Sequence, residues 1–268
     1  MSRKKPGRAV LVGVDESEAS LAAVRWAAAE ALRRDCQLQL FQAGTAAAEQ
    51  EARERFARAH RWLSRAAQVA QETAPEVATQ PVLRAGLAVD LLVERSRSVS
   101  LVVLGSHGLG GSRGAAIGSV ALRAAASTHC PAVVVRGRAA PGGAVVVGVD
   151  TDERVGEFAF EAAANRQAPL VAVHAWRSGG PGRAAAEDRA LRECTAAWTD
   201  KYPEVAVRIR AVRERSPGRA LLAVEGAQLL VIGSRDRSPG TGGLLGSTGN
   251  RLLARAACPV AVVRGALR

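Results

Sequence analysis

LVVLGSHGLGGSRGAAIGS, residues 101–119, is the stretch that decides the fold of this chain. Its first four residues form an apolar run typical of a buried strand, and a loop crowded with glycine follows. The alanine-rich sequence after Gly118 predicts a helix that begins at Ser119. Glycine lets a backbone approach an anion closely, and a helix N-terminus presents free N–H groups to it. Strand, loop and helix together therefore predict a phosphate-binding cradle.

The same pattern recurs at residues 229–248, so the chain carries two copies of one predicted site. The strand-like run RAVLVGVD, which ends at Asp15, is likewise repeated as AVVVGVD, which ends at Asp150. From the third predicted strand onward the halves align without gaps at an offset of 128 residues, whereas Asp15 and Asp150 are 135 apart. The second half is seven residues shorter before its third strand, and a shorter middle helix accounts for this difference.

Apolar strand-like runs alternate with helical patterns along the whole chain, which indicates parallel βαβ units. The sequence predicts an α/β protein with two tandem, doubly wound domains of five parallel strands each. GRAAPGG, residues 137–143, has no apolar periodicity, so we place the boundary there and predict domains at 1–137 and 138–268. The predicted strands are 8–15, 38–43, 77–83, 101–104, 132–136, 144–150, 169–175, 204–212, 228–233 and 259–264.

Apolar spacing also predicts which helix faces are buried. In the first predicted helix Leu32 continues the apolar face that Leu21 begins. In the long second helix Phe56 and Leu63 share a face, and His60 falls on that face as well. A lone histidine so placed is more often a packed core residue than a ligand, and we expect that here.

Composition bounds the class of protein. The chain has 268 residues, of which 48% are hydrophobic and 23% charged, and no apolar run reaches the roughly 18 residues of a membrane span. Net charge is +12 and divides evenly as +6 in residues 1–136 and +6 in 137–268. Aromatic residues make up 3% of the chain, too few for base-stacking platforms. We therefore expect a soluble protein with no membrane association and no dedicated nucleic-acid binding.

The four cysteines, Cys36, Cys130, Cys194 and Cys258, form no CxxC pair and no cluster with metal-ligand spacing. Cys130 and Cys258 occupy equivalent positions before apolar runs, where we expect burial. Nothing in MSRKKPGR and the sequence after it resembles a cleavable export signal. We expect reduced thiols, a cytoplasmic location and no metal site.

Asp15 ends the first predicted strand and the glycine loop follows the fourth. In an open parallel sheet, ligands bind outside the carboxyl ends of the strands where the strand order reverses, so both should line one crevice. A carboxylate accepts hydrogen bonds from a base amino group or a ribose hydroxyl, while the loop and Ser119 hold phosphates. The sequence thus predicts a nucleotide crevice.

Gly105-x2-Gly108-x9-Gly118-Ser119, together with VGVD in the first strand, resembles the motif of the universal stress protein family. The resemblance covers nearly the whole chain as a tandem, two-domain member. It implies a Rossmann-like sheet with strand order 3-2-1-4-5 in each domain. It also implies a pseudo-dimer formed within the chain or a homo-oligomer.

By that resemblance, ATP is the expected ligand, with Mg²⁺ as an optional companion. Adenosine would contact Asp15 and the backbone near Ala43. Arg113, inside the loop, is open to two interpretations, a phosphate contact or a solvated side chain. The nucleotide-binding residues that the resemblance implies are Asp15, Ala43, Gly105, His107, Gly108, Gly118, Ser119 and Val120.

The second half keeps the spacing but changes the chemistry, because Asp236 replaces the second glycine. Like charges about 4 Å apart cost about 4 kcal/mol at an effective dielectric near 20, although Arg235 and Arg237 could neutralise Asp236. Thr151-Asp152 replaces Glu16-Ser17, and Glu214 stands where the first half has Gly86. We expect a weaker second site at Asp150, Gly233, Gly246 and Ser247.

Three functions remain open. The sequence contains no GxxxxGK[ST] and no GxSxG, which leaves His107 as the one candidate acid or base near the phosphates. We expect an ATP-binding, stress-response regulatory protein that binds nucleotide without efficient catalysis. A nucleotide-free interaction protein and a slow ATPase on the same scaffold are the alternatives.

Overall fold

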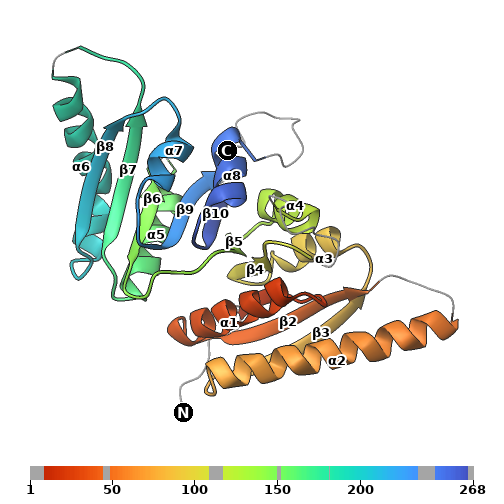
Figure 1. Cartoon of the computed structure of the whole chain (residues 1–268). Helices are drawn as coiled ribbons and strands as arrows, with labels where there is room; N and C mark the ends of the chain where they lie inside the picture. Colours follow the sequence, from red (N-terminus) through yellow and green to blue (C-terminus); the bar gives the residue numbers. More distant parts are fainter. Residues whose placement is uncertain are drawn as a thin grey trace. The chain divides into compact units, whose positions relative to one another are not determined.

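The computed structural model describes residues 9–44, 49–108, 117–149, 152–180, 182–234 and 245–264, and all that follows refers to these residues. The chain divides into two compact units, Met1–Val135 and Arg136–Arg268. Each unit is a parallel sheet with helices on both faces (Figure 1). The predicted α/β fold class, with two tandem doubly wound domains, is confirmed.

In the first unit the strand order is β3-β2-β1-β4-β5, and every neighbouring pair is parallel. Val10 of β1 pairs with Leu38 of β2 on one side and with Leu101 of β4 on the other, so the order reverses at β1. The elements are β1 (Ala9–Gly13), α1 (Glu18–Arg33), β2 (Gln37–Gly44), α2 (Glu49–Thr73), β3 (Thr79–Ala85), α3 (Ala88–Arg95), β4 (Leu101–Gly105), α4 (Ser119–Ser127) and β5 (Ala132–Val135).

The second unit repeats this plan with the order β8-β7-β6-β9-β10. Its middle helix has 19 residues against 25 in α2, which accounts for most of the shortening that the sequence offsets predicted. The elements are β6 (Ala144–Gly148), α5 (Glu153–Ala164), β7 (Leu170–Trp176), α6 (Arg183–Lys201), β8 (Val207–Arg213), α7 (Pro217–Leu222), β9 (Ala227–Ser234), α8 (Ser247–Arg255) and β10 (Val260–Arg264).

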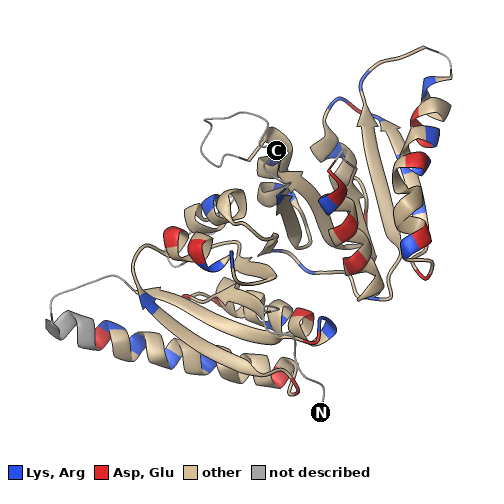
Figure 2. Ribbon diagram, turned by 180° about the vertical axis from the view of Figure 1, so that it is seen from behind, with Lys and Arg blue, Asp and Glu red and all other residues tan. Residues whose placement is uncertain are grey.

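Each sheet is buried because helices cover both of its faces. In the first unit α1 and α2 pack together on one face and α3 and α4 on the other; α5 with α6 and α7 with α8 repeat this in the second. Strands covered on both sides have no polar face, which is why β1, β4 and β5 read as unbroken apolar runs. Charged residues therefore gather on the helices and loops, and the central strands are largely tan in Figure 2.

The helix faces correct three sequence expectations. On α2 the buried stripe passes through Ala59, Leu63, Ala66 and Ala70. Phe56 is 58% exposed and His60 is exposed, and their rings meet edge to face with centroids 4.3 Å apart. The prediction of a packed core for these two side chains is wrong, because they lie just beyond the edge of that stripe.

Leu32 of α1 is likewise 44% exposed, so its predicted burial is wrong. It lies in the last turn of α1, whose buried face runs through the smaller residues Ala27, Ala28 and Ala31. Of the two cysteines expected to be buried, Cys258 is buried and Cys130 half-buried.

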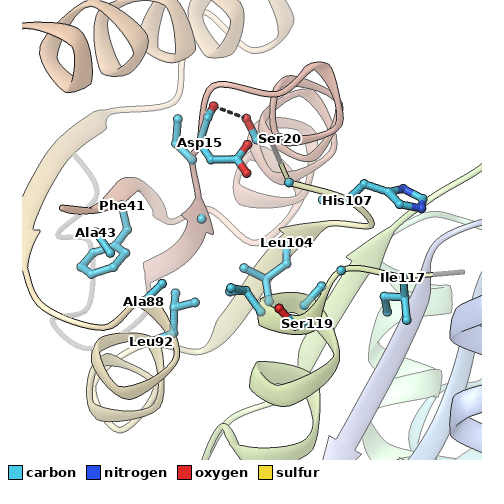
Figure 3. Close-up of a pocket in the computed structure, with 17 residues that line it drawn as sticks. Asp15, Ser20, Phe41, Ala43, Ala88, Leu92, Leu104, His107, Ile117 and Ser119 are labelled. Atoms are coloured by element: carbon cyan, nitrogen blue, oxygen red, sulfur yellow. Dashed lines mark hydrogen bonds between the residues drawn. The ribbon is translucent and has the colours of Figure 1, made fainter. Parts of the chain in front are cut away.

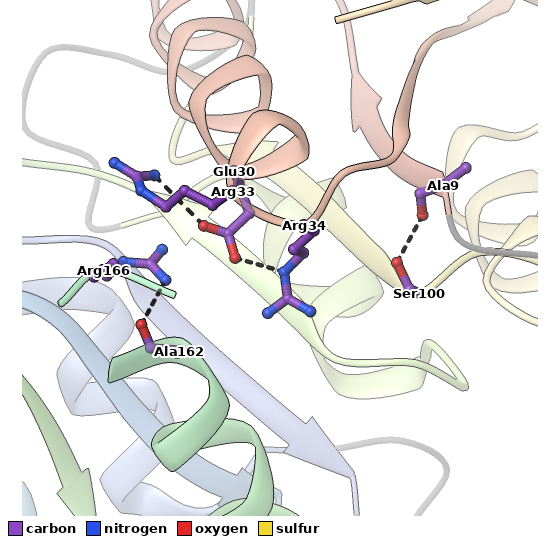
Figure 4. A network of polar contacts seen from close by, with 7 residues as sticks. All are labelled: Ala9, Glu30, Arg33, Arg34, Ser100, Ala162 and Arg166. Atoms are coloured by element: carbon purple, nitrogen blue, oxygen red, sulfur yellow. Dashed lines mark hydrogen bonds and ion pairs between the residues drawn. The ribbon is translucent and has the colours of Figure 1, made fainter. Parts of the chain in front are cut away.

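The buried carboxylate of Glu30 lies between two arginines at the end of α1 (Figure 4). Arg34 Nε lies 2.6 Å from one of its oxygens and Arg33 Nη1 lies 3.6 Å from the other. A buried charge is tolerated only when it is paired and hydrogen-bonded, and these arginines satisfy that requirement. In the described part of the chain, no helix is long and apolar enough to cross a membrane.

Candidate functional site

A cavity of about 470 Å³ opens at the carboxyl ends of β1 and β4, where the strand order of the first unit reverses (Figure 3). Ligand pockets in proteins commonly measure about 300–1,000 Å³, so this cavity can hold a small organic molecule. Its lining residues are Gly13, Val14, Asp15, Ser20, Phe41, Ala43, Ala88, Leu92, Leu104, Gly105, His107, Gly108, Ile117, Gly118, Ser119, Val120 and Ala121.

Asp15 provides a fixed acceptor at one end of this first cavity. It follows β1 directly, and its Oδ1 accepts hydrogen bonds from the N–H of Ser17 at 3.0 Å and from Ser17 Oγ at 2.5 Å. The backbone carbonyl of Asp15 accepts a further bond from Ser20 Oγ at 2.7 Å, drawn as a dashed line in Figure 3. Three bonds thus fix both the backbone and the carboxylate of Asp15.

The second carboxylate oxygen of Asp15 lies against Gly108. A Cβ placed on Gly108 would be 2.6 Å from Asp15 Oδ2, closer than real atoms approach. Residue 108 must therefore be glycine for the carboxylate to keep this position. The sequence indicated Gly108 as a phosphate contact, whereas the structure also assigns it a packing role beside Asp15.

The N-terminus of α4 forms the other end of the first cavity. Gly118 is the N-cap residue, its own N–H donates to the carbonyl of Ser106 at 2.8 Å, and no side chain caps the helix. The first N–H groups of a helix have no intrahelical acceptor and carry partial positive charge, which favours an anion. Ser119 and Val120, in the first turn, line the cavity. This end can therefore bind an anion with N–H donors and the hydroxyl of Ser119.

The motif glycines serve different purposes. A Cβ on Gly105 would lie 2.7 Å from the backbone C and O of Ala19, so Gly105 is needed for α1 to pack against β4. A Cβ on Gly118 would meet its nearest protein atom, the carbonyl oxygen of Ser106, at 3.5 Å, an ordinary contact. The packing of the described residues therefore does not require glycine at 118.

His107 also lines the first cavity, but its imidazole points away from Asp15 (Figure 3). Its Nδ1 lies 2.9 Å from Ser106 Oγ, and its backbone carbonyl lies 3.3 Å from Ser17 Oγ. The ring is held by its neighbour in sequence, and the backbone of the loop is held to the start of α1.

The eight residues that the sequence predicted for the first site, from Asp15 and Ala43 to Val120, all line this one cavity. Sequence reasoning missed the apolar wall, above all Phe41 of β2 and Leu92 of α3. Phe41 pairs with Gly13, the last residue of β1, so it lies beside the carboxyl end of β1, and this register is known only from the structure. Arg113 lies outside the described residues.

A second cavity, about 170 Å³ in volume, occupies the equivalent place in the second unit. Gly233, Gly246 and Ser247 line it as predicted, whereas Asp150 lies outside the described residues, as do Thr151, Arg235, Asp236 and Arg237. The other lining residues are Gly148, Val149, Val173, His174, Ala175, Pro217, Leu221, Ile232, Leu245, Thr248 and Gly249.

Of the residues that line the second cavity, His174 has an acidic partner on α6. His174 Nε2 lies 3.4 Å from Glu187 Oε2, and Arg183 pairs with the other oxygen of Glu187. Glu214 instead holds the turn before α7, accepting from the N–H of Ser216 at 3.0 Å. Within the described residues, no three histidine, cysteine, aspartate or glutamate side chains gather as a metal site would need.

Comparison with known proteins agrees with this geometry. The profile of the universal stress protein family matches residues 7–136 and 144–264. A universal stress protein of Mycobacterium bovis is 32% identical over 309 residues, covering 98% of this chain and 97% of that protein. One from Mycobacterium tuberculosis is 32% identical over 299 residues, covering 100% of both chains.

Among solved structures, a universal stress protein from Archaeoglobus fulgidus shares the fold with a TM-score of 0.78 at 19% identity, and the match covers 98% of each chain. The family profile matches each half of the sequence separately, in the segments that contain the two cavities. The chain therefore belongs to the universal stress protein family, and it carries two family domains in tandem.

Proposed function

We propose that the first unit binds ATP in the 470 Å³ cavity and that the protein acts as a nucleotide-dependent regulator in the stress response. The observation that carries the proposal is that one end of the cavity offers a hydrogen-bond acceptor and the other end offers hydrogen-bond donors. Asp15 offers a carboxylate acceptor at one end, and the uncapped N-terminus of α4 offers N–H donors at the other. A nucleoside triphosphate has donors at its base and ribose and anionic oxygens at its phosphates.

The cavity walls fit the same ligand. Phe41, Leu92 and Leu104 form an apolar surface between the two ends, suited to the face of a base. Gly118 leaves the space of a side chain empty beside the helix N-terminus, where phosphate oxygens would lie. A Mg²⁺ ion would enter with the phosphates, since Mg²⁺ is commonly held by substrate phosphates and water.

Two measurements test this function. Mass spectrometry of the small molecules released when the purified protein is denatured should show ATP, and calorimetry of nucleotide-free protein should show ATP binding. Ser119→Ala should weaken that binding while leaving thermal unfolding of the free protein unchanged. An absence of released nucleotide, of binding and of any thermal shift with ATP would instead support the nucleotide-free interaction protein.

We propose binding rather than efficient turnover, because among the described residues that line the first cavity the only acid or base besides Asp15 is His107, whose ring points away from Asp15. ATP recovered intact after long incubation would support this. Hydrolysis that His107→Ala abolishes would favour the slow ATPase.

For the second unit we propose weak nucleotide binding at most. Its cavity of 170 Å³ is below the roughly 300 Å³ at which ligand pockets usually begin. Calorimetry should therefore give one strong ATP site per chain. Two sites of equal affinity would contradict this assignment.

A further inference from the structure

Ser17 does two things at the start of α1. As the N-cap residue, its Oγ accepts a hydrogen bond from the N–H of Ser20 at 3.1 Å, which satisfies one of the free donors of the helix. The same hydroxyl donates its single proton to Asp15 Oδ1 at 2.5 Å, rather than to the more distant carbonyl of His107 at 3.3 Å, and the backbone N–H of Ser17 donates to the same oxygen at 3.0 Å. One side chain therefore caps the helix and holds the carboxylate that faces the first cavity.

The second unit separates these two roles. Asp152 occupies the equivalent position, four residues after Gly148, as Ser17 is four residues after Gly13. It caps α5 by accepting from the N–H of Arg154 at 3.0 Å. An ionised carboxylate has no hydrogen to donate. Capping needs only an acceptor, which both residues supply, so the hydrogen-bond donor is what serine adds in the first unit.

That donor controls where the other oxygen of Asp15 lies. With Oδ1 held by Ser17, Oδ2 lies against Gly108, where an added Cβ would be only 2.6 Å from it. Within the described part of the chain, no hydrogen-bond donor reaches Oδ2. The carboxylate thus presents one oxygen to the protein and leaves the other for a ligand in the cavity.

We infer that Ser17 is a positioning residue of the first cavity, which holds Asp15 so that Oδ2 accepts a hydrogen bond from the nucleoside part of the ligand. This inference rests on the proposed function. It also gives a chemical reason for the difference between the two units, since Asp152 cannot do for a neighbouring carboxylate what Ser17 does for Asp15.

The test is calorimetry with three ligands: ATP, adenosine, and inorganic tripolyphosphate, which lacks the nucleoside. The variants are Ser17→Ala, which removes cap and donor, Ser17→Asp, which keeps a cap and removes the donor, and Ser17→Thr, which keeps both. Asp152→Ala is the matched control, because it removes the equivalent cap in the second unit. Thermal unfolding without ligand reports the loss of each cap.

Ser17→Ala should lose about tenfold in affinity for ATP and for adenosine, as expected for a lost hydrogen bond to a charged group. Ser17→Asp should lose at least as much, because it also places a second carboxylate beside Asp15. The affinity of Ser17→Ala for tripolyphosphate should not fall, because that ligand binds at the α4 end of the cavity. Ser17→Thr and Asp152→Ala should bind all three ligands as the unaltered protein does.

A purely structural Ser17 would give a different pattern. Ser17→Ala would then match Asp152→Ala in lowering the unfolding temperature without changing affinity, and this result overturns the inference. A Ser17→Asp variant that binds ATP normally despite its added charge also overturns it. If the unaltered protein binds ATP while the Ser17 variants bind it equally well, the inference alone fails. If the unaltered protein binds neither ATP nor adenosine, the proposed function itself fails.

Discussion

Alanine at two glycines of the same motif should have very different effects on stability. A Cβ on Gly105 would lie 2.7 Å from the backbone of Ala19, which cannot move without shifting α1 away from β4. Overpacking of this kind costs about 1–3 kcal/mol. A Cβ on Gly118 meets nothing closer than 3.5 Å, and the backbone there, at φ −72° and ψ 147°, suits any residue. Alanine at 118 should then change the free energy of unfolding by less than about 1 kcal/mol, because the restriction of the unfolded chain, worth about 0.4–1 kcal/mol, is offset by a poorer N-cap on α4.

The assay is thermal unfolding of both variants without nucleotide, followed by calorimetry with ATP. At about 4 °C per kcal/mol for a domain of this size, Gly105→Ala should lower Tm by about 4–12 °C, whereas Gly118→Ala should change it by less than about 4 °C. Gly118→Ala should nevertheless lose at least about tenfold in ATP affinity, or about 1.4 kcal/mol, because its methyl group enters the cavity at the helix N-terminus. A Gly118→Ala variant that is stable and binds ATP normally would refute the interpretation of that space as a ligand site.

Three further predictions concern stability. Glu30→Ala should cost about 3 kcal/mol in urea unfolding, because it removes the carboxylate from a buried ion pair; a loss below about 1 kcal/mol would contradict this. Burial raises the pKa of the Cys130 thiol from 9.0 to about 12 and that of Cys258 to about 11. In the unfolded chain these thiols ionise at a lower pH than in the folded protein. Burial of the neutral thiols therefore contributes fully to stability below pH 9, and this contribution is lost between pH 9 and about 12. Alanine at both positions should flatten that part of the pH–stability curve. Leu63→Ala should cost about 2–5 kcal/mol and the exposed Phe56→Ala less than about 0.5 kcal/mol, and equal losses would show that Phe56 is packed after all.

The sequence determined the architecture because the signals for it are local and repeated. Apolar runs buried on both faces, helices between them and the repeat at a constant offset predict two doubly wound sheets without any tertiary information. The offset difference between Asp15 and Asp150 also predicted the shorter middle helix that α6 proves to be. All eight residues predicted for the first site line one cavity, because the carboxyl ends of neighbouring parallel strands meet at one edge of the sheet.

The tertiary structure decided what each of those residues does. Gly105, Gly108 and Gly118 are alike in the sequence, and only the atoms around them show that the first packs against α1, the second lies against the Asp15 carboxylate and the third has space for a Cβ. Serine is a common helix cap, and only the structure shows that the hydroxyl of Ser17 is also hydrogen-bonded to Asp15. Periodicity gives the direction of a side chain around its own helix. It does not show how far the neighbouring element extends, because that depends on packing between elements distant in the sequence.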